Sequence, residues 1–268
     1  MSYPARIPPG RRQLTALVRA AGDVIRLDDA QATLGLTRTA AAKRLARWAE
    51  QGWLRRVGRG AYMPVPLDSL QSELVLADPW LLVPVLFAPA YVGGRTAAEH
   101  WDLTEQIFRD VVVLTARPVR RRSHVSQGMT FTLKHIDERL LFGTRTVWRG
   151  RTRVEVSDVH RTIIDVLDDP ALGAGIQHVS DCLARYLARP DRDIDRLLDY
   201  ASQLGNGAVY KRLGYLAERL SADNSLLETC RERLTAGDAK LDPSLDCQRL
   251  VTRWQLRVPN SWARGVAT

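Results

Sequence analysis

The sequence predicts an α+β protein of two domains, a small helical unit with a basic hairpin and a larger domain that joins a small mixed sheet to a helical array. The chain has 268 residues, 45% of them hydrophobic, which is enough for two ordinary cores. Positive charge is concentrated in residues 1–65, where 12 Lys and Arg stand against four Asp and Glu. We therefore expect one domain over residues 1–66 and a second over residues 67–268.

Three short helices are predicted near the N-terminus. They cover residues 11–20, 28–34 and 37–51, with a short extended piece at 24–27. Asp28 and Thr37 are suitable N-caps for the second and third helices, and Gly35 permits the turn between them. This order is that of a helix-turn-helix unit.

The third helix has two different sides when it is projected at 100° per residue. Its apolar side, which would seat it in the domain, carries Ala41, Leu45, Trp48 and Ala49. Its other side, with Thr39, Lys43 and Arg47, is left for a major groove, and Arg38 lies in the first turn, where a recognition helix usually meets base edges. We expect all four to contact base edges. Arg44 lies on the margin and is better placed for a phosphate.

A basic hairpin follows the helices. Two strands, 53–57 and 61–65, are linked by Gly58-Arg59-Gly60, whose glycines allow positive φ. We expect Arg59 to enter a minor groove and Arg55 and Arg56 to contact phosphates. Together these features predict a winged helix-turn-helix that binds double-stranded DNA. A protein-docking module with a solvated basic face is the alternative.

A second basic block lies in residues 117–153, with ten basic and two acidic side chains. Strands are predicted at 110–114, 129–135, 144–149 and 151–156, and in the last two the arginines alternate with Thr or Val. Such alternation places the arginines on one face of a sheet, either as a solvated face or as a second nucleic-acid surface. The residues of that surface would be Arg120, Arg121, Arg122, Arg145, Arg149, Arg151 and Arg153.

After residue 156 the pattern becomes helical. Ser157 or Asp158 can cap the first helix of the series. The predicted helices are 158–168, 170–188, 194–204, 208–220 and 225–234, and a final apolar segment, 250–258, is expected to be extended.

Several function classes are disfavoured. Cys182, Cys230 and Cys247 are too few and too widely spaced for a disulfide framework or a CxxC site, so we expect them to be reduced and buried. No apolar run reaches the ~18–20 residues of a membrane span and no signal peptide opens the chain. The expectation is a soluble, cytoplasmic protein without membrane contact.

An enzymatic role is not expected, nor is a cofactor or a metal. Asp158, His160 and Asp165 lie close in sequence, but helical projection separates His160 from the two carboxylates, and Arg161 suits an i,i+4 ion pair with Asp165. A nuclease motif would need Pro190-Asp191 and Asp238-Ala239-Lys240 on strands, whereas both fall in loop-like surroundings. Gly205-Asn206-Gly207 fits a helix end and a turn better than a phosphate cradle.

Four stretches carry a resemblance to a known family. In order along the chain they are "GRGAYMPVP", "YVGGRTAAEHWDLTEQ", "RVEVSDVHRTIIDVLDDP" and "LGNGAVYKRLGYLAE". Their combination over residues 11–220 resembles the AbiEi antitoxins of bacterial toxin-antitoxin pairs. Two departures are Gly93-Gly94-Arg95, where many relatives carry Ser, and the polar Asp158-Val159-His160.

The resemblance implies a winged helix-turn-helix that represses its own operon at inverted repeats, and a C-terminal domain that opposes a nucleotidyltransferase-like toxin. Inverted repeats would accommodate two copies of the chain. Two alternatives stay open: an interaction protein that binds the toxin directly and DNA only secondarily, and a winged-helix regulator unrelated to any toxin. A nuclease fused to a winged helix is a third class, which the spacing does not favour.

Overall fold

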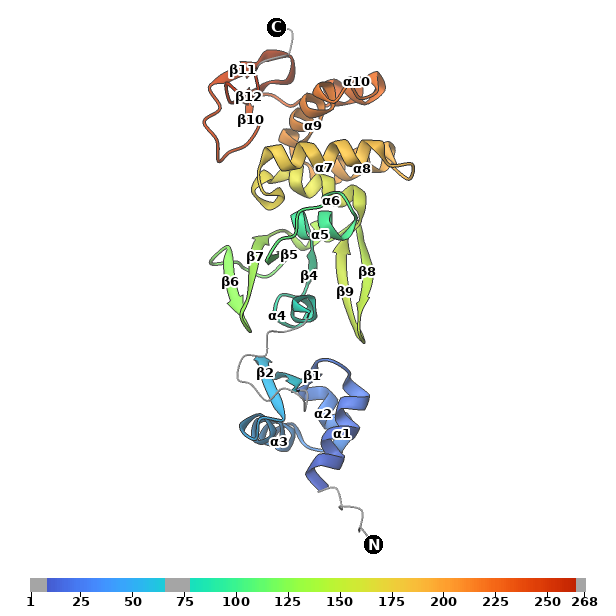
Figure 1. Cartoon of the computed structure of the whole chain (residues 1–268), viewed down its shortest axis with the longest axis vertical. Helices are drawn as coiled ribbons and strands as arrows, with labels where there is room; N and C mark the ends of the chain where they lie inside the picture. Colours follow the sequence, from blue (N-terminus) through green and yellow to red (C-terminus); the bar gives the residue numbers. More distant parts are fainter. Residues whose placement is uncertain (1–8, 66–77, 264–268) are drawn as a thin grey trace. The chain divides into compact units, whose positions relative to one another are not determined.

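The computed structural model describes residues 9–65 and 78–263, and its α+β architecture confirms the predicted fold class (Figure 1). The chain divides into two compact units. The first comprises the described part of Met1–Ala88 together with Val125–Met129 and Thr146–Val154, and the second comprises Pro89–His124, Thr130–Arg145 and the described part of Glu155–Thr268.

The first unit contains the three predicted helices and a small antiparallel sheet. The elements are α1 (Pro9–Ala21), β1 (Ile25–Arg26), α2 (Leu27–Leu34), α3 (Arg38–Glu50), β2 (Leu54–Gly58) and β3 (Ala61–Pro64), with strand order β1-β3-β2. Thr37 is the N-cap of α3, and Gly35 ends α2 at φ 64°, both as predicted. The N-cap assigned to Asp28 is wrong, because the N-cap of α2 is Arg26, two residues earlier, and the Asp29 carboxylate accepts the Arg26 N–H at 2.7 Å.

The core of this unit is formed where all three helices meet the sheet. The predicted apolar side of α3 is buried at Ala41, Leu45 and Trp48, and Ala49 is partly buried. These side chains pack with others from α1, α2 and the strands, among them Leu17, Ile25, Ala30 and Leu54. Burial of the apolar side leaves the polar side of α3 toward solvent, as an amphipathic helix requires.

Asp23, between α1 and β1, binds the turn between β8 (Thr144–Arg149) and β9 (Thr152–Ser157). Its carboxylate accepts the backbone N–H of Arg151 at 2.7 Å, and the Arg151 side chain donates to the Arg19 carbonyl at 2.5 Å. The first unit also contains η1 (Pro79–Leu82) and α4 (Val83–Leu86). The hairpin turn is therefore a packed part of this unit.

The largest described sheet has six strands in the order β6-β7-β5-β4-β9-β8. It contains both parallel and antiparallel pairs, so the prediction of a mixed sheet is confirmed. β5 runs antiparallel to β4 and parallel to β7, and β4 runs parallel to β9. The strands not yet delimited are β4 (Ala90–Val92), β5 (Asp110–Thr115), β6 (Ser123–Ser126) and β7 (Met129–His135). β4 and β6 were not predicted, because they have only three and four residues and little alternation.

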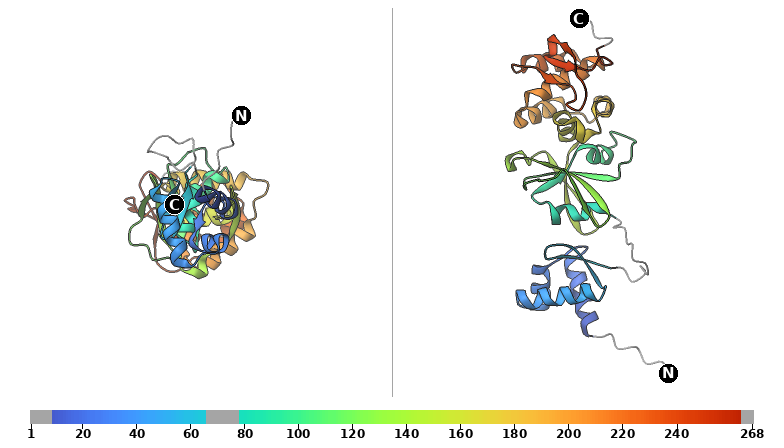
Figure 2. Two further views of the ribbon diagram at one scale, coloured as in Figure 1. Left: turned by 90° about the horizontal axis from the view of Figure 1, so that it is seen from below. Right: turned by 90° about the vertical axis from the view of Figure 1, so that its left-hand side faces the viewer.

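Helices α6 to α9 gather at one end of the sheet strands, and a small second sheet lies beyond them (Figures 1 and 2). The helical elements are α5 (Gly94–His100), η2 (Glu138–Leu140), α6 (Val159–Asp168), η3 (Pro170–Gly173), α7 (Ile176–Ala188), α8 (Ile194–Leu204), α9 (Gly207–Arg219) and α10 (Asn224–Glu232). The second sheet contains β10 (Ala239–Lys240), β11 (Arg249–Val251) and β12 (Leu256–Val258), with η4 (Thr252–Trp254) between the last two.

Three predictions in this region need correction. The helix expected over 170–188 is divided, because Ala174 and Gly175 adopt φ of 63° and 94° and end η3 before α7 begins. The final segment is interrupted by η4, where Gln255 also has positive φ. Asp238-Ala239-Lys240 is not wholly in a loop, since Lys240 lies on β10.

A buried polar cluster connects α6 with β4. The predicted i,i+4 pair is confirmed, with Arg161 Nε 2.9 Å from Asp165 Oδ1, but both side chains are almost fully buried. The Tyr91 hydroxyl donates to Asp165 and accepts from Arg161, each at 3.1 Å. Burial alone would lower the pKa of Arg161, but Asp165 and Tyr91 outweigh burial and raise it. Removal of one partner from such a pair costs about 3–5 kcal/mol of stability.

Gly93 and Gly94 allow this cluster to form beside the sheet. A Cβ at Gly93 would lie 2.5 Å from Leu114 Cδ1 and 3.1 Å from Asp165 Oδ2. Gly94 has φ of 56°, and a Cβ there would lie 2.7 Å from the Leu172 carbonyl oxygen. The two glycines are thus required by close approach and, at Gly94, by backbone conformation.

We predict that His160 makes the stability of the protein depend on pH. Its Nδ1 lies 2.9 Å from the Tyr186 hydroxyl, which itself donates to the Asp193 carbonyl, so Nδ1 carries the proton. Burial lowers the pKa of His160 below its ordinary 6.5. Because the unfolded chain then binds a proton more readily, the unfolding free energy should fall as pH drops below 6.5.

Urea unfolding between pH 5 and 8 measures this effect. His160→Asn, which keeps a donor near the Nδ1 position, should flatten the profile below pH 6.5. An unchanged profile for His160→Asn would contradict the assignment.

Candidate nucleic-acid interface

The polar side of α3 is an exposed basic surface. Arg38, Thr39, Lys43 and Arg47 are all exposed, while the opposite side of the helix is buried. The Thr37 hydroxyl accepts the Ala40 N–H at 3.4 Å and so caps the end of the helix that carries Arg38 and Thr39. Thr39, Lys43 and Arg47 therefore share one accessible helix face, and Arg38 is exposed in the first turn of the helix outside that face.

Arg38 is held by an acidic side chain from α2. Its Nη1 lies 3.1 Å from Asp28 Oδ1, and the two side chains are 71% and 82% exposed. A pair this exposed adds little stability. Its geometric effect is larger, because it directs the guanidinium of a residue in the first turn of α3.

Arg44 is hydrogen-bonded to α1 at the exposed margin of α3. Its Nη1 donates to the Gln13 side-chain oxygen, and its guanidinium lies 5.8 Å from the Trp48 ring centroid. Arg44 is half-buried, in agreement with its predicted place at the margin of the helix. It joins α1 to α3 as well as adding positive charge.

The hairpin of β2 and β3 places Arg59 at its turn. Arg59 and Arg56 are exposed and Arg55 is half-buried. Gly60 has φ of 70°, as expected. The prediction of a positive φ at Gly58 is wrong. Gly58 instead ends β2, where a Cβ would lie 3.0 Å from Leu86 Cδ2, a close contact with the end of that side chain.

The second basic block is partly neutralised by local contacts. Arg149 lies 3.7 Å from Asp78 and 4.2 Å from the Trp80 ring centroid, and Arg122 pairs with Asp169 at 2.5 Å. Arg151 donates to a backbone carbonyl of α1, as described above. Arg120, Arg121 and Arg145 are exposed, and no ion pair joins them to another described residue.

The prediction that the arginines of β8 and β9 lie on one face of the sheet is wrong. Arg153 donates to Thr146 Oγ1 at 3.5 Å and lies 5.8 Å from the Trp148 ring centroid. Thr146 and Trp148 alternate with Arg145 and Arg149 along β8, so Arg153 is on the opposite side from those two arginines. Sequence reasoning also missed Trp148, which is 63% exposed; its place among strand arginines is the signal that was available.

The residues considered as candidates for catalysis or phosphate binding cap helices in the structure. Asp158 is the N-cap of α6, accepting the Arg161 N–H at 2.8 Å and the Tyr200 hydroxyl at 2.9 Å. Gly205 ends α8 at φ 74° and Asn206 caps α9, as predicted for a helix end and a turn. Across residues 9–65 and 78–263, no three His, Cys, Asp or Glu side chains are grouped as a metal site requires.

The three cysteines are free and buried, as expected. Burial raises the pKa of the Cys182 and Cys230 thiols to about 12. They are therefore protonated and unreactive near neutral pH. No helix within the described ranges is long and apolar enough to cross a membrane.

Three helices, a three-stranded antiparallel sheet and an exposed basic third helix define the first unit as a winged helix-turn-helix. Residues 12–65 match the model of the family described as a transcriptional regulator, AbiEi antitoxin, which confirms the predicted family resemblance over this segment.

The whole fold is similar to that of the RV2827C protein from Mycobacterium tuberculosis, known from a crystal structure. The two chains share 16% identity with a TM-score of 0.64, over 94% of this chain and 92% of the other. This likeness covers both units and establishes the fold. No curated protein sequence matches the chain.

Proposed function

We propose that this protein is a DNA-binding antitoxin that represses its own operon and is not an enzyme. The exposed basic side of α3, inside the segment that matches the AbiEi regulator family, is the observation that carries the proposal. Lys43 and Arg47, with Arg38 and Thr39, contact base edges in the major groove. Arg44, Arg55 and Arg56 contact phosphates, and Arg59 enters the adjacent minor groove.

The matched family name also supports a toxin as the second partner. We propose that the chain counters a nucleotidyltransferase-like toxin encoded beside it. Co-purification of the two proteins would support direct binding. Protection of growth without co-purification would support neutralisation by repression or at the target of the toxin. Operator binding without any protection would favour a regulator unrelated to a toxin.

Replacement of Lys43 and Arg47 together with alanine tests the DNA-binding proposal. Because each good base contact contributes about 1–3 kcal/mol of discrimination, specific promoter affinity should fall about 30-fold or more. A mobility-shift titration on the promoter of this gene, with the thermal midpoint as a check on folding, measures the loss. Arg185→Ala with Arg196→Ala removes the same charge from exposed positions on α7 and α8 and should leave binding unchanged. Full binding by the α3 variant would overturn the proposal.

A second experiment asks whether Asp28 orients Arg38 for base reading. Asp28→Asn should lower discrimination at the base pair that Arg38 reads by about tenfold, while non-specific binding rises because one negative charge near phosphate is removed. Glu50→Gln at the end of α3 makes the same charge change without the ion pair. In an Arg38→Ala background, Asp28→Asn should no longer alter discrimination. An equal effect in both backgrounds would show that Asp28 does not act through Arg38.

For the second basic block, we propose an auxiliary phosphate-contacting surface at Arg120 and Arg121, which are exposed and which no ion pair joins to another described residue. Arg145 is not part of it, because β8 and β6 are at opposite edges of the sheet. Arg120→Gln with Arg121→Gln should reduce the slope of log K against log[salt] by up to about 1.8, since each phosphate contact contributes about 0.9. Arg122→Gln, whose side chain is paired with Asp169, is the matched control and should have less effect. An unchanged slope in the double variant would mean that these residues do not contact DNA.

A further inference from the structure

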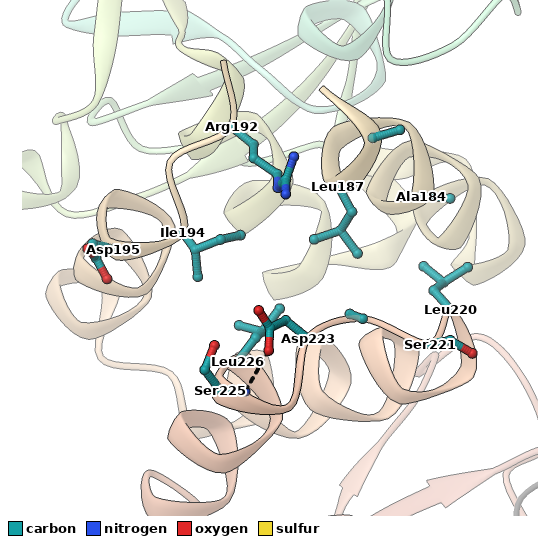
Figure 3. Close-up of a pocket in the computed structure, with 12 residues that line it drawn as sticks. Ala184, Leu187, Arg192, Ile194, Asp195, Leu220, Ser221, Asp223, Ser225 and Leu226 are labelled. Atoms are coloured by element: carbon teal, nitrogen blue, oxygen red, sulfur yellow. Dashed lines mark hydrogen bonds between the residues drawn. The ribbon is translucent and has the colours of Figure 1, made fainter. Parts of the chain in front are cut away.

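A cavity of about 510 Å³ lies among the ends of four helices in the second unit (Figure 3). Its walls are the last turn of α7, the first turns of α8 and α10, the link between α7 and α8, and the link between α9 and α10. This volume falls within the range of small-molecule sites, which are often found between the helices of a bundle. None of its lining residues belongs to the surfaces discussed above for DNA.

Most of the lining is apolar. Leu187, Ile194 and Leu226 point into the cavity from α7, α8 and α10 (Figure 3). Ala184, Ala188, Leu220 and Ala222 complete the apolar surface. The pocket is open to solvent on one side, and an apolar side chain of a ligand could pack on these residues.

Two opposite charges face each other across these apolar side chains, and the third charged residue of the lining, Asp195, lies beyond Ile194 and does not point toward them (Figure 3). Arg192, in the link before α8, and Asp223, in the link before α10, point toward one another in Figure 3. No ion pair joins either of them to any residue within the described ranges. Each can therefore interact with a ligand group without first breaking an internal ion pair.

Both charges are positioned by backbone contacts. Arg192 Nη1 donates to the Arg189 carbonyl at 3.0 Å. Asp223 Oδ1 accepts the Ser225 N–H at 3.2 Å and caps α10, which leaves Oδ2 available. The link that leads to Asp223 is fixed by a turn at the end of α9. In this turn Ser221 has φ of 53° and the Ala222 N–H donates to the Ala217 carbonyl at 2.9 Å.

We propose that this cavity binds a small zwitterion with an apolar side chain, the chemistry of a free apolar α-amino acid. The ligand carboxylate accepts from the Arg192 guanidinium, a charge-assisted contact that suits arginine. The ligand ammonium donates to Asp223 Oδ2, and the side chain packs on Leu187, Ile194 and Leu226. Charge complementarity selects this class, because a purely anionic or purely cationic ligand would leave one of the two charges without a partner.

Isothermal titration of the full chain with L-leucine, L-methionine and L-phenylalanine tests the proposal. At least one should bind with a dissociation constant of about 1 mM or tighter. For that side chain, the amino acid amide, which lacks the carboxylate, and the corresponding acid without the amine should each bind at least tenfold more weakly. Glycine, which keeps both charges but has no side chain, should also bind at least tenfold more weakly.

Arg192→Gln and Asp223→Asn should each weaken binding at least tenfold. Asn is as good an N-cap as Asp, so the second variant preserves α10 while removing the charge. Arg196→Gln and Asp199→Asn, on the same α8 helix but outside the cavity, are the matched controls and should bind as the unchanged chain does. Circular dichroism of each variant verifies that the helices remain folded.

Three outcomes would overturn the proposal: no binding of any of the three amino acids at 10 mM, equal binding of an amino acid and its amide, or unaltered binding by both cavity variants. A further arm uses acetyl-Leu-Leu-amide, which has no charge. Tighter binding of this peptide than of free leucine would identify a groove for polypeptide and would also exclude the zwitterion. DNA plays no part in these measurements, so they stand apart from the proposed function.

Discussion

The buried ion pair of Arg161 and Asp165 is the constraint around which the second unit is organised. It lies on α6, the helix that packs against α5, α7, α8 and α9, and the Tyr91 hydroxyl extends it to β4 in the sheet. A buried charge that loses its partner lowers the stability of the fold. Any shift of α6 relative to β4 would break these contacts, so the pair specifies their relative position as well as stabilising it. The close approach of β4 requires glycine at Gly93, and the cap at Asp158 sets where α6 begins. Sheet, helix start and helix array therefore depend on the same few polar groups.

Positive charge serves two different purposes in this protein. Some arginines hold the structure together: Arg44 joins α3 to α1, Arg149 packs on an aromatic ring beside Asp78, and Arg151 contacts α1. Others, such as Lys43 and Arg47 on α3, are exposed and make no such contact with another described residue. A net charge cannot separate these two groups, because a guanidinium counts equally whether its partner is an aspartate of the same chain or a phosphate. The interface we propose is therefore smaller and more concentrated on α3 than the count of basic residues implies.

The sequence predicted the N-terminal unit well because its signals are local. Capping at Thr37, the turn at Gly35 and the apolar spacing of α3 are each set within one helix. The second unit was predicted less completely, since short strands such as β4 have little pattern of their own and acquire their conformation from neighbours distant in the chain. The burial of Arg161 and the opposed positions of Arg149 and Arg153 arise from tertiary packing, which periodicity cannot report. The cavity beside Arg192 and Asp223 likewise depends on how four helix ends converge.

The division of α3 into a buried side and an exposed side has an evolutionary consequence. Ala41, Leu45 and Trp48 hold the helix in its core, whereas Thr39, Lys43 and Arg47 make no contribution to that packing. Substitutions on the exposed side can therefore accumulate without loss of folding, and a duplicated gene can acquire a new operator while it keeps the same scaffold. Related copies in one cell would then bind different DNA sites because they differ at a few side chains on α3.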